Sequence, residues 1–386
     1  MKKFVLILLL CCIINFFPIN ILAVENSDLI PNAVSGILMD ADTGKIYFEK
    51  NRNKKVAVAS MTKMVAQIII LDKIKSKDIS WNDVVTVSKN AADMGGSQIY
   101  IAEGEKISVE DLMKGISMAS GNDATVAMAE YISGTEDKFV KLMNEKVSSL
   151  GLKNTQFKNS TGLDEEGHYS SAYDMAMIAR ELIVNYPEIL RFSSVYEDYL
   201  REDTKERFWL VNTNKLVRFY DGADGLKTGH TDAAGYCLAA TAKRNGLRLI
   251  AVVLGEKNAT VRNNETMNLL DYGYANIRVN KLKSMGEVVK KVKLDKADNE
   301  IVEIVLKNDL FVAEGVGDKG KKYSFVVNID SFNLPIVVGD NVGTIDVYFD
   351  NKKIKSGYLT VNKDIKSLSF SRLFYKEMID LVSGIL

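Results

Sequence analysis

The chain has 386 residues, of which 47% are hydrophobic and 26% are charged, and lysine plus arginine equal aspartate plus glutamate at 50 each. This composition is that of a folded globular protein rather than a disordered one, and the length suggests two domains. The balanced charge gives no electrostatic case for a nucleic-acid partner.

The N-terminus has the pattern of a secretory signal peptide. Two lysines precede an apolar run from residue 4 to residue 17 that contains one asparagine, and Ala23 stands before a polar stretch. The apolar run is shorter than a membrane span requires. We therefore expect residues 1–23 to direct export and to be removed. An N-terminal anchor that is not cleaved is the alternative.

Cysteine and histidine are too rare to suggest a metal site or a disulfide. Cys11 and Cys12 lie in the expected signal peptide, so the mature chain would keep only Cys237, which lies in an apolar run and is interpreted as a core residue. His168 and His230 belong to no Cys/His cluster. No metal and no organic cofactor are predicted, and a structural role in loop hydrogen bonds is favoured for His168.

Two short strands around a turn at residues 42–44 are expected over residues 33–50, and a helix follows over residues 56–73, VAVASMTKMVAQIIILDK. The apolar residues of this helix share one face, whereas three polar residues form a narrow seam: Ser60, Lys63 and Gln67. A lysine at the edge of an apolar face loses hydration, which favours its neutral amine. A neutral amine near a hydroxyl is a base beside a nucleophile. A solvated lysine on an ordinary amphipathic helix is the alternative, since S-x-x-K is common.

The middle of the chain is interpreted as mostly helical from residue 91 to residue 133, with breaks at residues 94–97 and 120–122, and a further helix is expected over residues 174–184. Three strand-like runs follow: GLKTGHT, GYCLAATAK and LRLIAVVLG. Arg244-Asn245-Gly246 predicts a hairpin between the last two runs, and a helix is expected over residues 263–275. Residues 24–276 are thus predicted to form an α+β domain, an antiparallel sheet with helices packed on it.

The C-terminal part predicts a different architecture. Residues 277–364 contain short alternating strands with Asp, Asn and Gly turns, as expected of a small β-sandwich or barrel. Residues 365–386 predict an amphipathic helix that is too polar to span a membrane but suited to lie in its interface. A helix docked on its own domain or on a protein partner is the alternative.

Three short motifs occur in order along the chain: Ser60-Met61-Thr62-Lys63 on a helix, Ser120-Gly121-Asn122 between helices, and Lys227-Thr228-Gly229 on a strand. Each motif is weak alone. Their order, their structural contexts and the export signal together make a chance occurrence improbable. Cleavage of a peptide bond by acyl transfer requires an activated hydroxyl, a proton relay and stabilisation of an oxyanion.

The three motifs resemble the signature of the penicillin-binding serine peptidases. The text ASMTKMV, MASGNDA, GLDEEGHYSSAYDMA and GLKTGHTDAAGYCLAATA is similar in particular to the low-molecular-mass D-alanyl-D-alanine carboxypeptidases, over about residues 34–276. The trailing β domain and amphipathic tail also match the plan of that family. The resemblance implies a serine β-lactamase/DD-peptidase-like fold, removal of the terminal D-alanine from peptidoglycan stem pentapeptides, and covalent inhibition by β-lactam antibiotics.

The resemblance implies a role for each residue of the acylation machinery. Ser60 would be the nucleophile and Lys63 its general base. Ser120 would relay a proton, and Asn122 would orient Lys63 or the substrate amide. Lys227, which belongs with the substrate-binding residues, would add a positive charge that helps to keep Lys63 neutral. An edge-strand lysine that discourages aggregation is the alternative for Lys227.

Other residues would bind the substrate. The resemblance implies that Thr228 and Arg262 hold its terminal carboxylate and that the backbone N–H groups of Ser60 and His230 form the oxyanion hole. Gly229 would let the substrate lie along the strand edge. A surface arginine at a helix start is the alternative for Arg262.

The enzyme would act on the outer face of the cytoplasmic membrane, held there by its C-terminal helix. A β-lactamase of the same superfamily is one competing reading. The segment most similar to the E-x-x-L-N motif of a β-lactamase loop is residues 181–185. It has valine in place of leucine and continues a helix. A non-catalytic β-lactam sensor or wall-binding module is the other reading, and the three intact motifs argue against it.

Overall fold

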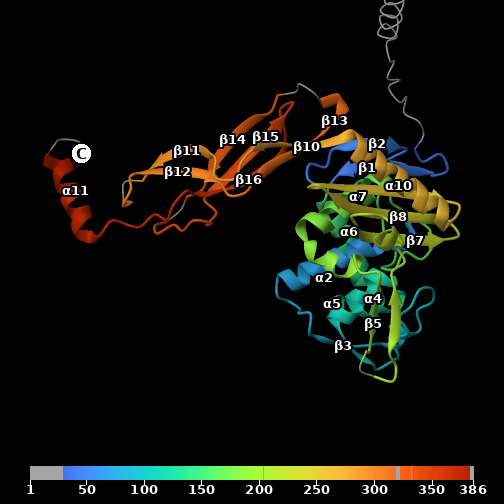
Figure 1. Cartoon of the computed structure of the whole chain (residues 1–386). Coiled ribbons are helices and arrows are strands. Elements are labelled where there is room, and N and C mark those ends of the chain that lie inside the picture. The colour runs from blue at the N-terminus through green and yellow to red at the C-terminus, as the bar shows by residue number, and fades with distance from the viewer. Residues whose placement is uncertain (1–28, 203, 295, 319–321, 332, 383–386) are drawn as a thin grey trace, which may run out of the picture.

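The computed structural model describes residues 29–382 except 203, 295, 319–321 and 332, so the expected signal peptide lies outside the described residues. The N-terminal domain, which ends with a long helix at Asn276, combines a sheet with helices, and the C-terminal β domain extends from it as an arm that ends in a helix (Figure 1). The predicted change from mixed to all-β structure is therefore confirmed.

A five-stranded antiparallel sheet organises the N-terminal domain in the order β2-β1-β9-β8-β7. Its strands are β1 (Ser35–Asp40), β2 (Ile46–Lys50), β7 (Ala223–Thr231), β8 (Gly235–Arg244) and β9 (Leu247–Glu256). Asn245 and Gly246 both have positive φ, 48° and 82°, as the predicted tight hairpin between β8 and β9 requires. Strand β7 forms one edge of the sheet.

Helices cover both faces of this sheet. On one face lie the following elements: η1 (Ala59–Thr62), α2 (Lys63–Lys75), α3 (Lys89–Ala92), α4 (Val109–Met118), α5 (Asn122–Ser133), α6 (Glu136–Ser149), α7 (Ala172–Asn185), η2 (Pro187–Ile189) and α8 (Leu190–Ser193). Helix α10 (Ala259–Asn276) covers the other face. Side chains alternate between the two cores along each strand, so that Ile250 and Val252 face one core while Leu249 and Ala251 face the other.

Helix α2 is buried more completely than its sequence pattern predicts. Every residue from Lys63 to Leu71 is buried, because α2 packs against α5, α6 and α7 in the middle of the domain. The expected polar seam at the edge of one apolar face is therefore wrong, and so is the placement of Ser60 in the α-helix. Ser60 lies in the 3₁₀ turn η1, and Lys63 begins α2.

Short elements complete the N-terminal domain: β3 (Val84–Thr86) paired with β4 (Lys106–Ser108), β5 (Glu197–Leu200) paired with β6 (Phe208–Val211), and α9 (Leu216–Phe219). The predicted break at residues 94–97 is present, but the prediction of helix is wrong for residues 98–108, which contain no helix and include strand β4. The helices on either side of Ser120-Gly121-Asn122 lie where they were expected.

The C-terminal β domain contains a two-stranded and a five-stranded antiparallel sheet. The first pairs β10 (Ile277–Lys283) with β13 (Leu310–Gly315), which η3 (Val316–Asp318) follows. The second has the order β11 (Val288–Lys293), β12 (Ile301–Leu306), β16 (Lys352–Val361), β15 (Gly343–Phe349) and β14 (Ser324–Ile329). Polar contacts join this domain to the β1–β2 hairpin, including a Tyr47 hydroxyl that donates to the Ala313 carbonyl at 3.0 Å and an ion pair between Lys45 and Asp318.

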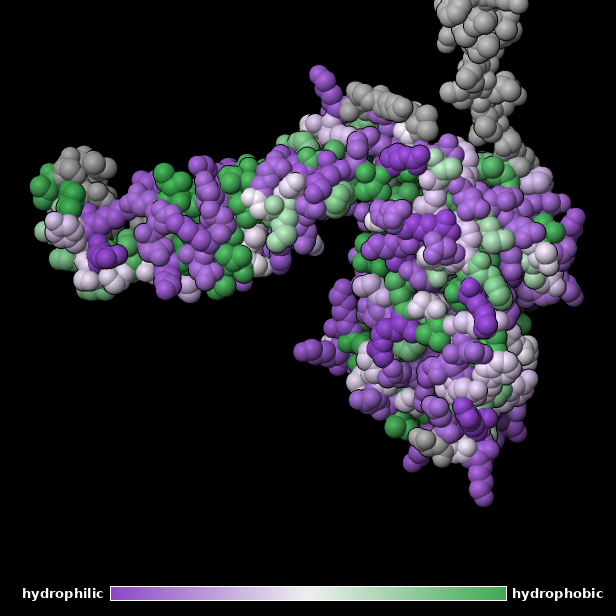
Figure 2. Space-filling view, in the orientation of Figure 1, coloured by the Kyte–Doolittle hydropathy of each residue, from purple (hydrophilic) through white to green (hydrophobic). Residues whose placement is uncertain are grey.

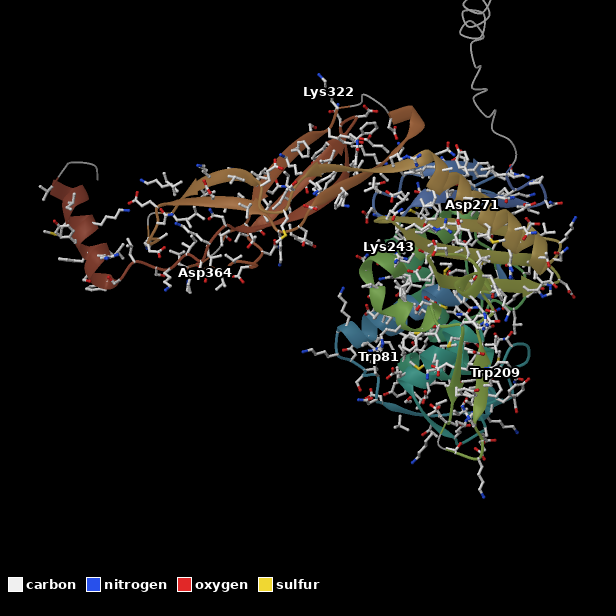
Figure 3. All side chains as sticks on the ribbon, viewed as in Figure 1. Trp81, Trp209, Lys243, Asp271, Lys322 and Asp364 are labelled. Atoms are coloured by element: carbon white, nitrogen blue, oxygen red, sulfur yellow. The ribbon has the colours of Figure 1, made fainter. Side chains whose placement is uncertain are left out.

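Helix α11 (Phe370–Val382) ends the described chain and follows the segment that contains Asp364 (Figure 3). Most of its described apolar side chains are exposed, with Phe370 at 84% and Val382 at 82% of full exposure, and they form part of the hydrophobic surface at the tip of the arm (Figure 2). Within the described residues, none of the helices combines the length and the hydropathy that crossing a bilayer would need.

Candidate active site

The junction of η1 and α2 places a lysine amine against a serine hydroxyl. Lys63 Nζ lies 2.8 Å from Ser60 Oγ, 2.6 Å from Asn122 Oδ1 and 2.7 Å from the carbonyl oxygen of Thr161. The lysine side chain is fully buried, whereas Ser60 is partly exposed. The structure thus brings together residues from the first two motifs that are 59 positions apart in the chain.

A neutral amine can make these three contacts, as can an ammonium group with three N–H donors, so the electrostatic environment decides the protonation state. A neutral amine has two N–H donors and one lone pair. Asn122 Oδ1 and the Thr161 carbonyl can only accept, so they take the two N–H groups. The lone pair then points at the Ser60 hydroxyl, which can donate its proton to it. This is the arrangement of a general base on its nucleophile.

The electrostatic environment favours the neutral amine. Burial lowers the pKa of Lys63 well below its usual value, and the positive charge of Lys227 lowers it further. The nearby carboxylates of Asp123 and Glu136 act in the opposite direction. Their oxygens accept hydrogen bonds from the backbone N–H groups of Ile99 and Ser160 and make no direct contact with the amine.

The second motif lies at the junction of α4 and α5. Asn122 begins α5, and its amide nitrogen donates to the carbonyl of Gly95 at 2.7 Å, which fixes its oxygen toward Lys63. Ser120 has a left-handed φ of 64°, and its buried Oγ has no hydrogen-bond partner among the described residues. An unpaired buried hydroxyl costs free energy unless a ligand or water satisfies it.

The third motif lies on β7, which packs against η1. Lys227 is buried, its Nζ donates to the Thr228 carbonyl at 3.0 Å, and burial lowers its pKa to about 7, with a further contribution from the charge of Arg262. Thr228 Oγ1 donates to Thr213 Oγ1 at 2.7 Å. His230 is exposed, and its ring centroid lies 3.9 Å from that of Tyr236 on β8.

Gly229 has a structural role that differs from the one expected. A Cβ at this position would lie 2.5 Å from the carbonyl oxygen of Val58 and 3.3 Å from the Met61 nitrogen. The glycine therefore allows β7 to approach the backbone of the turn that carries Ser60. The expected role of Gly229 in letting substrate lie along the strand edge stays a prediction.

Arg262 lies in the first turn of α10 and is 5% exposed, so the expectation of a functional residue is favoured over that of a surface arginine. Its Nε and Nη2 donate to Asn263 Oδ1 at 3.1 and 2.9 Å. Among the described residues it forms no ion pair with a carboxylate. A buried cation without an anionic partner is costly, and an incoming carboxylate would relieve that cost.

His168 supports the site from behind, in the structural role predicted for it. The Lys158 N–H donates to His168 Nδ1 at 3.2 Å, so Nε2 carries the proton and donates to Thr62 Oγ1 at 2.8 Å. Burial lowers the pKa of His168 to about 4, so the imidazole is neutral at physiological pH. The ring thereby holds the end of η1 in place.

Sequence reasoning missed several contributors to this site. The Thr161 carbonyl receives a proton of Lys63, Thr213 holds Thr228, and Gly162 packs so closely on η1 that a Cβ would lie 1.9 Å from the Ala59 carbonyl oxygen. The contribution of Thr161 comes from a backbone atom, which leaves no residue-type signal. The glycines of the loop over residues 162–167 were the available hint.

A partly exposed serine beside a buried, neutral lysine, with uncompensated cations nearby, defines a serine hydrolase or acyltransferase that uses lysine as its base. The described residues contain no group of histidine, cysteine or acidic side chains arranged to hold a metal ion. The chain belongs to the D-alanyl-D-alanine carboxypeptidase family Peptidase_S11, which residues 23–258 match, and residues 278–367 match the C-terminal domain of penicillin-binding protein 5. The predicted family and α+β fold class are thereby confirmed.

Relatives cover nearly the whole chain. The D-alanyl-D-alanine carboxypeptidase DacF of Bacillus subtilis is 42% identical over 357 residues, which are 92% of each protein. The crystal structure of penicillin-binding protein 5 from Haemophilus influenzae is 33% identical, with a TM-score of 0.66 over 87% of this chain and 98% of that one. Penicillin-binding protein D2 from Listeria monocytogenes, solved in an ampicillin-bound form, is 30% identical, with a TM-score of 0.57 over 63% of this chain and 98% of that one.

Proposed function

We propose that this protein is an exported serine-type D-Ala-D-Ala carboxypeptidase that removes the terminal D-alanine from peptidoglycan stem pentapeptides. The observation that carries the proposal is the contact of 2.8 Å between Lys63 Nζ and Ser60 Oγ. The same nitrogen also donates hydrogen bonds to Asn122 Oδ1 and to the Thr161 carbonyl. Family membership supports the choice of reaction and substrate.

In the proposed reaction, Lys63 takes the proton of Ser60 while Ser60 Oγ attacks the carbonyl carbon between the two D-alanines. The backbone N–H groups of Ser60 and His230 stabilise the oxyanion. The proton reaches the leaving amine through Ser120, and D-alanine departs. Water then hydrolyses the acyl-enzyme with Lys63 as base, which restores the serine.

The terminal carboxylate of the substrate would bind Lys227, Thr228 and Arg262. Lys227 and Arg262 are both buried and neither forms an ion pair among the described residues, so a carboxylate between them offsets their mutual repulsion. A neutral or amidated C-terminus would lack that gain. The same residues would bind the carboxylate of a penicillin. Its β-lactam carbonyl would then acylate Ser60. The ampicillin-bound Listeria relative supports β-lactams as covalent inhibitors.

Incubation with a diacetylated tripeptide that ends in D-Ala-D-Ala tests the function, with mass spectrometry of the products. We expect loss of one D-alanine residue and a long-lived penicillin adduct on the protein. Rapid turnover of penicillin without D-alanine release would establish a β-lactamase instead. A stable adduct without any D-alanine release would establish a β-lactam sensor.

Glu181, the nearest candidate for a β-lactamase glutamate, lies on α7 within 3.8 Å of Lys146.

The proposed location is the outer face of the cytoplasmic membrane, with α11 in the membrane interface. The exposed apolar side chains of α11 support this placement. Deletion of residues 366–386 should release the protein from membranes into the soluble fraction while the hydrolysis of the tripeptide stays unchanged. Persistence in the membrane fraction would contradict the role of the helix and would point to an N-terminal segment that is not cleaved.

Substitution of Gly162 by alanine should slow acylation of Ser60 by penicillin about 100-fold, the scale of a displacement of about 1 Å in an active site. The residue has a φ of 87°, and the new Cβ would collide with the Ala59 carbonyl, so η1 must move. Gly104→Ala is the matched control, because Gly104 has a φ of 78° but open space around it. Equal acylation rates in the two variants would rule out the positional effect.

The pH dependence of acylation should depend on Lys227. Acylation requires neutral Lys63, so its rate falls as the pH drops through the pKa of that lysine. Lys227→Met removes a positive charge and therefore raises the pKa of Lys63, which moves this fall in rate toward higher pH. Rates of penicillin acylation measured across pH would show the shift. Lys243→Met, at an exposed lysine on β8 (Figure 3), is the control, and an unshifted profile in Lys227→Met would contradict the coupling.

A further inference from the structure

A cavity of about 690 Å³ lies between the N-terminal domain and the C-terminal β domain. Arg52 and Tyr173 contribute to its wall from the first domain, and Tyr323, Phe349 and Lys352 from the second. It is separate from the Ser60 site, and its size lies in the range of ligand-binding sites, which occur often at domain boundaries. In Figure 1 the arm leaves the body beside the β1–β2 hairpin, and residues 43–46 of this hairpin belong to the lining of the cavity.

The lining combines aromatic faces with cations. The rings of Tyr323 and Phe349 lie 5.6 Å apart, Lys45 Nζ lies 5.8 Å from the Phe349 ring, and the Arg52 guanidinium lies 5.8 Å from the Tyr173 ring. The lining also contains the Asn53 amide and the Thr43 hydroxyl. This mixture suits a ligand with apolar faces and polar edges, as a pyranose ring with an N-acetyl group has.

Two backbone contacts link the wall of this cavity with the segment that leads to the active site. Tyr173 N, in the first turn of α7, donates to the Arg52 carbonyl at 2.9 Å, and Val56 N donates to the Ser170 carbonyl at 2.8 Å in an isolated antiparallel bridge. At the other end of this segment, a second cavity of about 340 Å³ is lined by Ala57, Ala59 and His168, adjacent to Ser60.

The chain length between the two places limits how far apart they lie. Arg52 and Ser60 are eight residues apart, so their Cα atoms are separated by at most about 28 Å. An extended pentapeptide spans about 17 Å. A stem peptide bound at Ser60 can therefore cover more than half of this maximum separation, and the glycan that bears it would have to cover what remains.

We propose that the interdomain cavity binds the N-acetylated glycan strand of the wall polymer whose stem peptide enters the active site. This inference rests on the proposed function, because the glycan is the other half of that substrate. It makes the enzyme selective for polymer-linked stems over free peptides. Since the ligand contacts both domains, its binding also fixes the angle between them.

Binding of glycan strands that an amidase has freed of stem peptides tests the site, with isothermal titration calorimetry on the mature chain carrying Ser60→Ala. We expect saturable binding that weakens at least tenfold in Tyr173→Ala and in Tyr323→Ala, one from each wall. Tyr173→Phe should retain binding because it keeps the ring. Tyr358→Ala, at an exposed tyrosine that is not part of the cavity lining, is the matched control.

Absence of binding to the Ser60→Ala protein, or an equal loss in Tyr358→Ala, would overturn the proposal. Thermal melting of each variant separates lost binding from lost folding. In the protein with Ser60 intact, Tyr173→Ala should raise KM for glycan-linked pentapeptide and leave the free tripeptide unaffected. Failure to cleave either substrate would refute the proposed function, while the calorimetric result would still decide whether the cavity binds glycan.

Discussion

Replacement of Ser60 by alanine is expected to abolish both release of D-alanine and labelling by penicillin, with a loss of at least about 10⁴-fold in kcat. Among the described residues, the Ser60 hydroxyl is the only hydrogen-bond partner of the Lys63 amine that is partly open to solvent, so no neighbouring group can replace it as nucleophile. In Ser60→Ala the Lys63 amine can still act as a base, but no hydroxyl is present from which it could remove a proton.

The measurement is single-turnover acylation by a fluorescent penicillin together with mass spectrometry of the tripeptide. Ser76→Ala is a suitable control, because Ser76 is exposed at the opposite end of α2. It should acylate at the rate of the unmodified protein. Residual labelling of Ser60→Ala above the level of denatured protein would show that another nucleophile carries the reaction.

The site could be predicted where it depends on residue types that are unusual in their context. A serine and a lysine within an apolar helix and a lysine at the start of an apolar strand are conspicuous in the sequence, and the structure places Lys63 and Lys227 close enough for their charges to interact. The reason for the low pKa of Lys63 was anticipated correctly, whereas its degree of burial was not. Helix α2 has apolar residues on all sides. Hydrophobic periodicity identifies one buried face of a helix, so it cannot show that the opposite face is buried against other helices as well.

Other features of the site and the fold could not be predicted, because they depend on backbone atoms and on contacts between distant segments. The Thr161 carbonyl has the same chemistry as every other carbonyl, and only the folded loop shows that it meets Lys63 Nζ. The sequence cannot show that Gly229 contacts the backbone of η1, because η1 comes from a segment about 170 positions earlier in the chain.

Replacement of Lys63 by methionine is expected to reduce acylation by penicillin about 10²- to 10⁴-fold, the contribution of a positioned general base. Methionine fits the buried volume of the lysine stem, so Ser60 stays in place but loses its proton acceptor. Loss of the amine also leaves Asn122 Oδ1 and the Thr161 carbonyl without their donor, which costs about 1–3 kcal/mol for each buried acceptor. Near-normal labelling in this variant would refute the role of Lys63 as base.

The same variant has a second readout that does not depend on catalysis. The pKa of Lys63 is lower in the folded chain than in the unfolded chain, so between these two pKa values the unfolded state binds the extra proton. The free energy of unfolding therefore rises with pH in this window, by about 1.4 kcal/mol per pH unit for one proton. Lys63→Met removes that contribution, so its stability should rise less steeply from neutral pH toward pH 10 in urea unfolding experiments. Parallel stability curves for the two proteins would mean that the buried amine remains protonated, and a protonated amine has no lone pair with which to accept the proton of Ser60.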